Sequence, residues 1–281
     1  MNRLSDLLDM QTAHGAFPSE IRMEDNPVME DENAFITALV LLELLRQEQT
    51  GAVMDAVDRG LGFIEACEEE PDSGLFRFYP RALPSAKLHI PLHADLDDSA
   101  LCILVLVLSG RRTKEWAQGV TPRVFEKHRL LYTGGHPPWV GPGAFKTWAG
   151  ETSGNHVDCC VNLNILALYA CLGLGGTDVY RAALRSVLAG IKLTRLDPLH
   201  MRHLAPFYAH PYEVYEALSR AVYFGAGELA GKPEEFRHFE AQRGQDAKQP
   251  VCCNDWGQPI WSSTALQAAR SLAPRSATAG T

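Results

Sequence analysis

The chain has 281 residues, 46% of them hydrophobic, so it is long enough to bury a sizeable core. Its net charge of −8, with no basic cluster larger than Arg111-Arg112, argues against nucleic acid as a partner. No apolar run reaches about 18 residues, so no transmembrane segment is predicted. The seven cysteines include no C-x-x-C pair, and several lie within apolar runs. This usage is typical of reduced thiols and predicts a cytoplasmic protein.

Five stretches share one pattern, in which polar residues directly precede an apolar or amphipathic helix. They cover residues 31–45, 91–108, 158–172, 210–222 and 261–272. Counted from residues 31, 95, 158, 210 and 261, their starts are 64, 63, 52 and 51 positions apart. A recurrence of this length indicates a chain built from repeated helical hairpins.

Amphipathic helices are predicted between these stretches. They cover about residues 52–69, 113–130, 178–193 and 225–242. An apolar helix must be buried on all sides, whereas an amphipathic helix needs to bury only one face. We therefore predict an all-α fold, an α/α toroid of about five to six helical hairpins with the apolar set inside. Residues 1–272 are expected to form a single domain, and residues 273–281 a disordered tail.

Three loops before the apolar stretches share a glycine followed two positions later by phenylalanine. They read Gln11-x-x-x-Gly15-x-Phe17, Glu70-x-x-x-Gly74-x-Phe76 and Trp139-x-x-x-Gly143-x-Phe145. Glycine permits a tight turn with positive φ, and the aromatic ring can pack under that turn. These loops are therefore expected to connect the helices in a repeated way.

Three carboxylates, Asp95, Asp97 and Asp98, stand directly before the apolar run from Ala100 to Leu108. One interpretation is helix capping, with Asp95 as the N-cap and the other two in the first turn. The other is chemical, because crowded carboxyl groups cannot all ionise and can hold a proton.

The loop repeats resemble those of the terpenoid cyclase and protein prenyltransferase superfamily of α/α toroids. Asp95-Leu96-Asp97-Asp98-Ser99-Ala100 resembles the D-x-D-D-T-A motif of class II terpene cyclases, such as squalene–hopene cyclases. The repeats span most of the chain, but only the first keeps its Gln, none keeps Trp, and Ser99 replaces the usual Thr. The resemblance implies an enzyme of the isomerase or lyase class, which cyclises an isoprenoid after protonating it.

By this resemblance Asp97 is the proton donor, and Asp95 and Asp98 are its ionised, hydrogen-bonded partners. Aromatic side chains and histidines near the helix starts are candidates for binding the substrate and stabilising its cations. These candidates are His93, Phe76, Tyr79, Trp148, His156, Tyr208, His210, Tyr212 and Trp261. Further candidate cavity aromatics are Phe78, Trp139, Phe145, Phe207, Tyr215 and Trp256.

Two alternatives stay open. Asp158, Cys160 and His210 resemble the zinc ligands of the prenyltransferase β subunit, and this set suits catalytic zinc with an open position. The chain would then be a zinc-dependent prenyltransferase-like enzyme. In the other alternative the toroid binds a lipid or a partner without catalysis. No cofactor is expected for the cyclase; zinc or magnesium are the metals considered, although no D-D-x-x-D magnesium motif occurs.

The expected partner is a small apolar isoprenoid. In the resembling family a second helical domain usually closes the cavity, and 281 residues leave no room for one. We expect a partner chain, such as a homodimer mate, or the long loops 74–94 and 132–157 to supply that wall.

Overall fold

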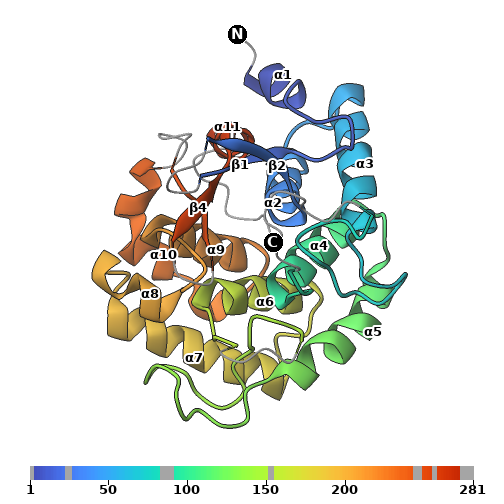
Figure 1. Cartoon of the computed structure of the whole chain (residues 1–281). Helices are drawn as coiled ribbons and strands as arrows, with labels where there is room; N and C mark the ends of the chain where they lie inside the picture. Colours follow the sequence, from blue (N-terminus) through green and yellow to red (C-terminus); the bar gives the residue numbers. More distant parts are fainter. Residues whose placement is uncertain are drawn as a thin grey trace.

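A computed structural model of the chain describes residues 3–22, 27–82, 92–150, 155–242, 249–254 and 258–272 (Figure 1). Residues 273–281, predicted as a disordered tail, lie outside the described residues, as do parts of the loops 74–94 and 132–157. The chain is mostly helical with one small sheet, so the prediction of a helical fold is confirmed in its main feature.

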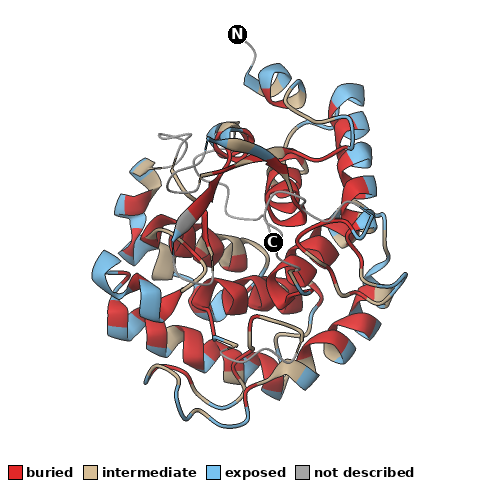
Figure 2. Ribbon diagram, viewed as in Figure 1, coloured by how far each residue is buried: buried red, intermediate tan, exposed pale blue. Residues whose placement is uncertain are grey.

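Five of the helices begin close to the five predicted starts. They are α2 (Ala34–Leu44), α4 (Leu96–Leu108), α6 (Cys159–Cys171), α9 (Pro211–Tyr223) and α11 (Thr264–Leu272). Helix α2 packs on α4, α4 on α6, α6 on α9, and α11 on α2. Their residues are largely buried (Figure 2), because α2, α4 and α6 carry apolar side chains on every face.

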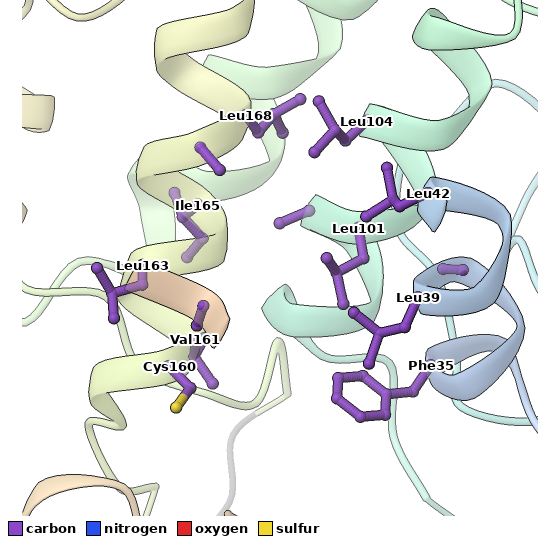
Figure 3. Close-up of a cluster of buried hydrophobic side chains, with 14 of the residues drawn as sticks. Phe35, Leu39, Leu42, Leu101, Leu104, Cys160, Val161, Leu163, Ile165 and Leu168 are labelled. Atoms are coloured by element: carbon purple, nitrogen blue, oxygen red, sulfur yellow. The ribbon is translucent and has the colours of Figure 1, made fainter. Parts of the chain in front are cut away.

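Leucines fill the space between the first three of these helices. Figure 3 shows Leu39 and Leu42 of α2 beside Leu101 and Leu104 of α4, with Leu168 of α6 across from them. All five are buried in one continuous core. Burying such a side chain stabilises the fold by roughly 1.5–3 kcal/mol, so this cluster holds the buried helices together.

Amphipathic helices cover the buried set from outside. They are α3 (Gly51–Ala66), α5 (Lys114–Phe125) and α7 (Asp178–Thr194). Helix α3 packs on α2 and α4, α5 on α4, and α7 on α6. In α7, for example, Tyr180, Ala183 and Val187 are buried, whereas Arg181 and Arg185 are exposed. Helix α1 (Arg3–Leu8) packs against α11 and α3.

The fourth predicted amphipathic helix, over residues 225–242, is wrong. The segment instead contains η3 (Gly227–Leu229), α10 (Lys232–Glu235) and η4 (Arg237–Gln242). Gly225 and Gly231 adopt positive φ values of 106° and 86°, and Pro233 lies just beyond. The two glycines interrupt the helix, whereas Pro233 lies in the first turn of α10, where proline is tolerated. The remaining short helices are η1 (Glu126–His128), η2 (Pro198–His200) and α8 (Met201–Leu204).

A four-stranded antiparallel sheet, which the sequence analysis did not predict, joins the two ends of the chain. Its order is β2-β1-β4-β3, with β1 (Pro18–Ile21), β2 (Met29–Glu32), β3 (Cys252–Cys253) and β4 (Pro259–Ser262). Glu20 of β1 lies opposite Ser262 of β4. Strands of two to four residues are too short to show an alternating pattern in sequence.

The three loop glycines all adopt positive φ, at 91° for Gly15, 71° for Gly74 and 92° for Gly143. A Cβ on Gly15 would lie 2.3 Å from the Arg59 carbonyl oxygen, so the loop touches the outer helix there. The phenylalanines two positions later are buried in each loop. No helix of the described residues is long and apolar enough to cross a membrane.

Candidate functional site

The three acids lie at the first turn of α4, and all of them are buried. Asp95 is the N-cap, and its Oδ1 accepts a hydrogen bond of 2.7 Å from the Asp98 backbone N–H. The Ser99 hydroxyl donates to the Asp95 carbonyl and accepts from the Phe76 N–H. Capping therefore accounts for the position of Asp95. It does not account for two further buried carboxyl groups.

Asp97 is held by donors from other helices and loops. Its Oδ1 accepts a hydrogen bond of 2.7 Å from Asn164 Nδ2, and its Oδ2 accepts one from the Tyr208 hydroxyl. Arg220 in turn donates to Asn164 Oδ1. A carboxyl group has about four lone-pair positions, so these two bonds leave positions free for a proton.

Neither carboxyl oxygen of Asp98 accepts a hydrogen bond from a described residue, although Asp98 is only 1% exposed. Its hydrogen-bonding neighbour is the Asp95 carboxyl group, to which a protonated Asp98 donates. Burial, together with the charges of Asp95 and Asp97, raises the pKa of Asp98 well above its ordinary value. A buried carboxylate without donors is costly, so the neutral form is favoured. These surroundings disfavour the ionised form that was expected for Asp98.

The pKa values of Asp95 and Asp97 are raised as well. Burial and the neighbouring Asp97 raise the pKa of Asp95 to about 7. Burial also raises the pKa of Asp97, against the opposing effects of Tyr208, Asn164 and Arg220. At neutral pH the cluster therefore retains protons that exposed carboxyl groups would have lost.

This cluster predicts a pH dependence of stability that centres on Asp98. Its pKa is higher in the folded chain than the value near 3.9 of an unfolded aspartate. Its stabilising contribution is thus fully present below about pH 4 and is lost as the pH rises. Asp98→Asn removes this titration, and the amide N–H can still donate to Asp95, so the variant should gain stability over wild type between pH 4 and 8.

Urea unfolding of both proteins at pH 4, 6 and 8 measures that gain. The control is Asp55→Asn on the exposed face of α3, which should keep the wild-type dependence on pH. A stability difference between Asp98→Asn and wild type that stays constant over this range would contradict the assignment.

A pocket of about 70 Å³ adjoins the three acids. Its apolar wall consists of Phe35, Phe78, Trp148, Val161, Phe207 and Trp261. Tyr208, Thr147, Cys252, Cys253 and Asn254 complete it. Figure 3 shows Phe35 and Val161 at the same end of the core cluster, where α2 and α6 begin. We call this the acid pocket.

Some of the predicted substrate-binding residues lie in the acid pocket and others do not. Trp148, Tyr208 and Trp261 line it. Phe76 is buried behind the acids and pairs with Asp95 through its backbone. Tyr79 packs edge-on against Phe78 at 4.9 Å, outside the lining. Of the further candidate aromatics, Phe78 and Phe207 line the acid pocket, and Trp256 lies outside the described residues. Trp139, Phe145 and Tyr215 are buried outside the lining.

Tyr212 and the predicted histidines also lie outside the lining of the acid pocket. Tyr212 is buried beneath the Arg270 guanidinium, 5.1 Å from its ring. His93 is exposed, and His156 is exposed at the edge of a neighbouring pocket. His210 is the N-cap of α9, where its Nδ1 accepts a bond of 3.1 Å from the Tyr212 N–H. For His210 capping is the observed role.

The candidate zinc ligands are not gathered into a metal site. Asp158 is the N-cap of α6 and accepts hydrogen bonds from the N–H groups of Cys160, Val161 and Phe207. No three His, Cys, Asp or Glu side chains in the described part of the chain are placed to hold a metal ion. Both oxygens of Asp158 are thus committed to the backbone.

Three features of the site were absent from the sequence analysis. Asn164 and Arg220 connect to Asp97, and Phe35 lines the acid pocket. One signal was available, because Asn164 is a polar residue inside an otherwise apolar helix. A buried amide there needs a partner, and the sequence could not show that Asp97, 67 positions away, supplies it.

No protein-family model matches the chain, and no curated protein matches it in sequence. Among solved structures it is similar to the type II terpene cyclase MstE from Scytonema in its apo form, at a TM-score of 0.45 and 14% identity over 95% of this chain and 93% of that one. A variant of the same cyclase, in complex with geranylgeranyl dihydroxybenzoate as its substrate, is similar at a TM-score of 0.47 and 12% identity. That match covers 96% of this chain and 93% of the cyclase chain. A protein from Actinoplanes is similar at a TM-score of 0.47 and 13% identity, over 96% of this chain and 95% of that protein's chain. All three are likenesses at low sequence identity.

Proposed function

We propose that this chain is a proton-initiated cyclase of an isoprenoid substrate, with Asp97 as the general acid. We further propose that residues 1–272 form a single α/α-toroid domain, in which the loops before the buried helices are structural repeats. The observation that carries the function is the acid pocket. It places a buried carboxyl group with raised pKa against an aromatic wall. An acid of this kind, kept protonated in apolar surroundings, is what alkene protonation requires.

The reaction follows from these groups. The Asp97 O–H proton adds to one carbon of an alkene, and the alkene π electrons form the new C–H bond. The other carbon becomes a cation, which the π electrons of a second alkene in the chain attack to form a C–C bond and close a ring. Loss of a proton from the last cation to water or a carboxylate ends the sequence. The protons balance, so no cofactor enters this scheme.

The chain's own residues divide this work among them. Asn164 and Tyr208 orient Asp97, and their hydrogen bonds stabilise the carboxylate that remains after the proton leaves. Trp148 and Trp261 offer π faces to the migrating cation, which they can stabilise by roughly 0.5–2 kcal/mol each. The apolar wall also keeps water from capturing the cation early.

The product in heavy water provides the test. Purified protein is incubated in D₂O with polyprenyl alcohols and polyprenyl diphosphates of 15 and 20 carbons as probes. We expect a cyclic product that carries one deuterium at the protonated carbon, with any diphosphate group retained. Formation of inorganic diphosphate with no deuterium in the product would indicate ionisation of the ester and would contradict a proton-initiated route.

A non-catalytic lipid-binding toroid makes a different prediction in the same assay. The probe would be recovered unchanged after binding. A partner chain or homodimer that closes the acid pocket remains a proposal, and sedimentation of the protein with and without the probe would measure it.

A further inference from the structure

Arg220 lies outside the lining of the acid pocket, but it is connected to Asp97 through Asn164. It stands in the last turn of α9, and its guanidinium donates a hydrogen bond to Asn164 Oδ1. Side chains on a helix lean toward the N-terminus of that helix. Both α6 and α9 begin beside the acid pocket, near Val161 and just after Tyr208, so the two side chains lean toward the acids.

Arg220 fixes the direction in which the Asn164 amide faces. A guanidinium carries N–H groups and no acceptor, so it can bind only the amide oxygen. The amide nitrogen then faces the acid, where it donates to Asp97 Oδ1 at 2.7 Å and to the Tyr208 hydroxyl at 3.4 Å. Because the Tyr208 oxygen accepts from Asn164, its own O–H donates to Asp97 Oδ2. Every hydrogen bond in this set therefore runs from Arg220 toward Asp97.

This direction affects how readily Asp97 gives up a proton. Hydrogen bonds that a carboxylate accepts favour the ionised form over the protonated one. Burial raises the pKa of Asp97, and the hydrogen bonds of Tyr208 and Asn164 and the charge of Arg220 oppose that rise. A reversed Asn164 amide would present its oxygen to Asp97, which could then keep its proton by donating it to that oxygen. Such an acid would be weaker.

The other titratable groups around Asp97 are acids and thiols. Asp95 and Asp98 lie on the same turn of α4, Asp158 and Cys160 at the start of α6, and Cys252 on β3. These groups are neutral or anionic, and an anion beside Asp97 favours its protonated form. The cation that acts on Asp97 from within the described part of the chain is Arg220.

We propose that Arg220 is a positioning residue for proton transfer, which fixes the Asn164 amide so that Asn164 and Tyr208 both donate to Asp97. This inference rests on the proposed cyclase function. The proton leaves from a lone-pair position that neither donor occupies and adds to the alkene, and the O–H electron pair stays on Asp97. The resulting carboxylate keeps both hydrogen bonds, so no side chain has to turn during the step.

A carbon NMR titration of protein labelled at the aspartate carboxyl carbons tests this arrangement without substrate. The Asp97 signal is identified by its absence from Asp97→Asn. We expect the midpoint of its titration to rise by about one pH unit or more in Arg220→Met, because an opposite charge nearby is lost. Arg220→Lys keeps a charged group that can only donate, so its midpoint should lie closer to that of wild type.

The matched control is Arg46→Met. Arg46 is another half-buried arginine at the end of α9, 4.5 Å from the Tyr223 ring, and it donates to Glu43. Its loss should leave the Asp97 midpoint unchanged. An unchanged midpoint in Arg220→Met, or an equal rise in both arginine variants, would overturn the proposal.

A second variant keeps the test decisive if Arg220→Met does not fold. Arg220→Gln loses the charge but retains an N–H donor for Asn164, so it should raise the midpoint by a smaller amount. A midpoint equal to that of wild type in Arg220→Gln would likewise contradict the proposal.

Turnover shows whether this effect acts on the reaction. In Arg220→Met we expect kcat below the midpoint to fall by up to about tenfold per pH unit of the rise, because a weaker acid protonates an alkene more slowly. The loss of activity at high pH should move upward equally, and KM should stay within about twofold. A lower kcat at every pH without that movement would contradict the proposal and leave the cyclase intact. Cyclisation by Asp97→Asn at the wild-type rate would contradict the cyclase proposal while leaving the titration of Asp97 intact.

Discussion

Replacing Asp97 by asparagine is expected to lower the rate of cyclisation by roughly 10²–10⁴-fold, the usual contribution of a general acid. The amide has nearly the shape of the carboxyl group and still offers an oxygen to Asn164 or Tyr208. It has no proton acidic enough to protonate an alkene. The variant should therefore fold and bind substrate, and single-turnover product formation measures the loss.

A second buried aspartate provides the comparison for this variant. Asp158 is also buried at a helix start, and burial raises its pKa to about 7, but it lies outside the lining of the acid pocket. We expect Asp158→Asn to retain most of the turnover, because asparagine is also a good N-cap. If Asp158→Asn abolished turnover and Asp97→Asn did not, the zinc alternative would gain support and the acid assignment would fail.

The largest expected effect on stability concerns the ion pair between Glu213 of α9 and Arg270 of α11. Both side chains are 2% exposed, and their two hydrogen bonds are 2.8 and 2.6 Å long. Removing one partner leaves a buried charge without compensation, which costs about 3–5 kcal/mol. We expect Arg270→Met to lower the melting temperature by on the order of 10 °C.

Replacing the other partner, in Glu213→Gln, should lower the stability less than Arg270→Met does. The charge of Glu216 also acts on Arg270, so Glu213→Gln leaves the guanidinium with one carboxylate nearby, whereas Arg270→Met leaves the Glu213 carboxylate without its ion-pair partner. The double variant Glu213→Leu/Arg270→Met should be more stable than Arg270→Met alone, because no unpaired charge remains at the pair. Thermal melts of the three variants measure this order. A double variant that lost the full sum of the single effects would show that packing, and not charge, dominates here.

This ion pair also illustrates what local sequence could not reveal about the fold. The helix starts were predictable because each has a local cause. Asn33, Asp95 and Asp158 cap the buried helices that follow them, and the apolar runs demand burial. The predicted helix over residues 225–242 failed for a local reason too, the positive φ of Gly225 and Gly231. By contrast, no local feature of the sequence predicts the pairing of β1 with β4, which lie about 240 positions apart.

The candidate site divides in the same way. Local sequence is enough to predict that Asp95, Asp97 and Asp98 stand together at the start of a buried helix, because adjacent residues on one helical turn are neighbours in any fold. Which groups face these acids depends on the tertiary structure. Asn164, Tyr208 and Arg220 reach Asp97 from 67, 111 and 123 positions away, through packing of helices and loops that local sequence does not encode.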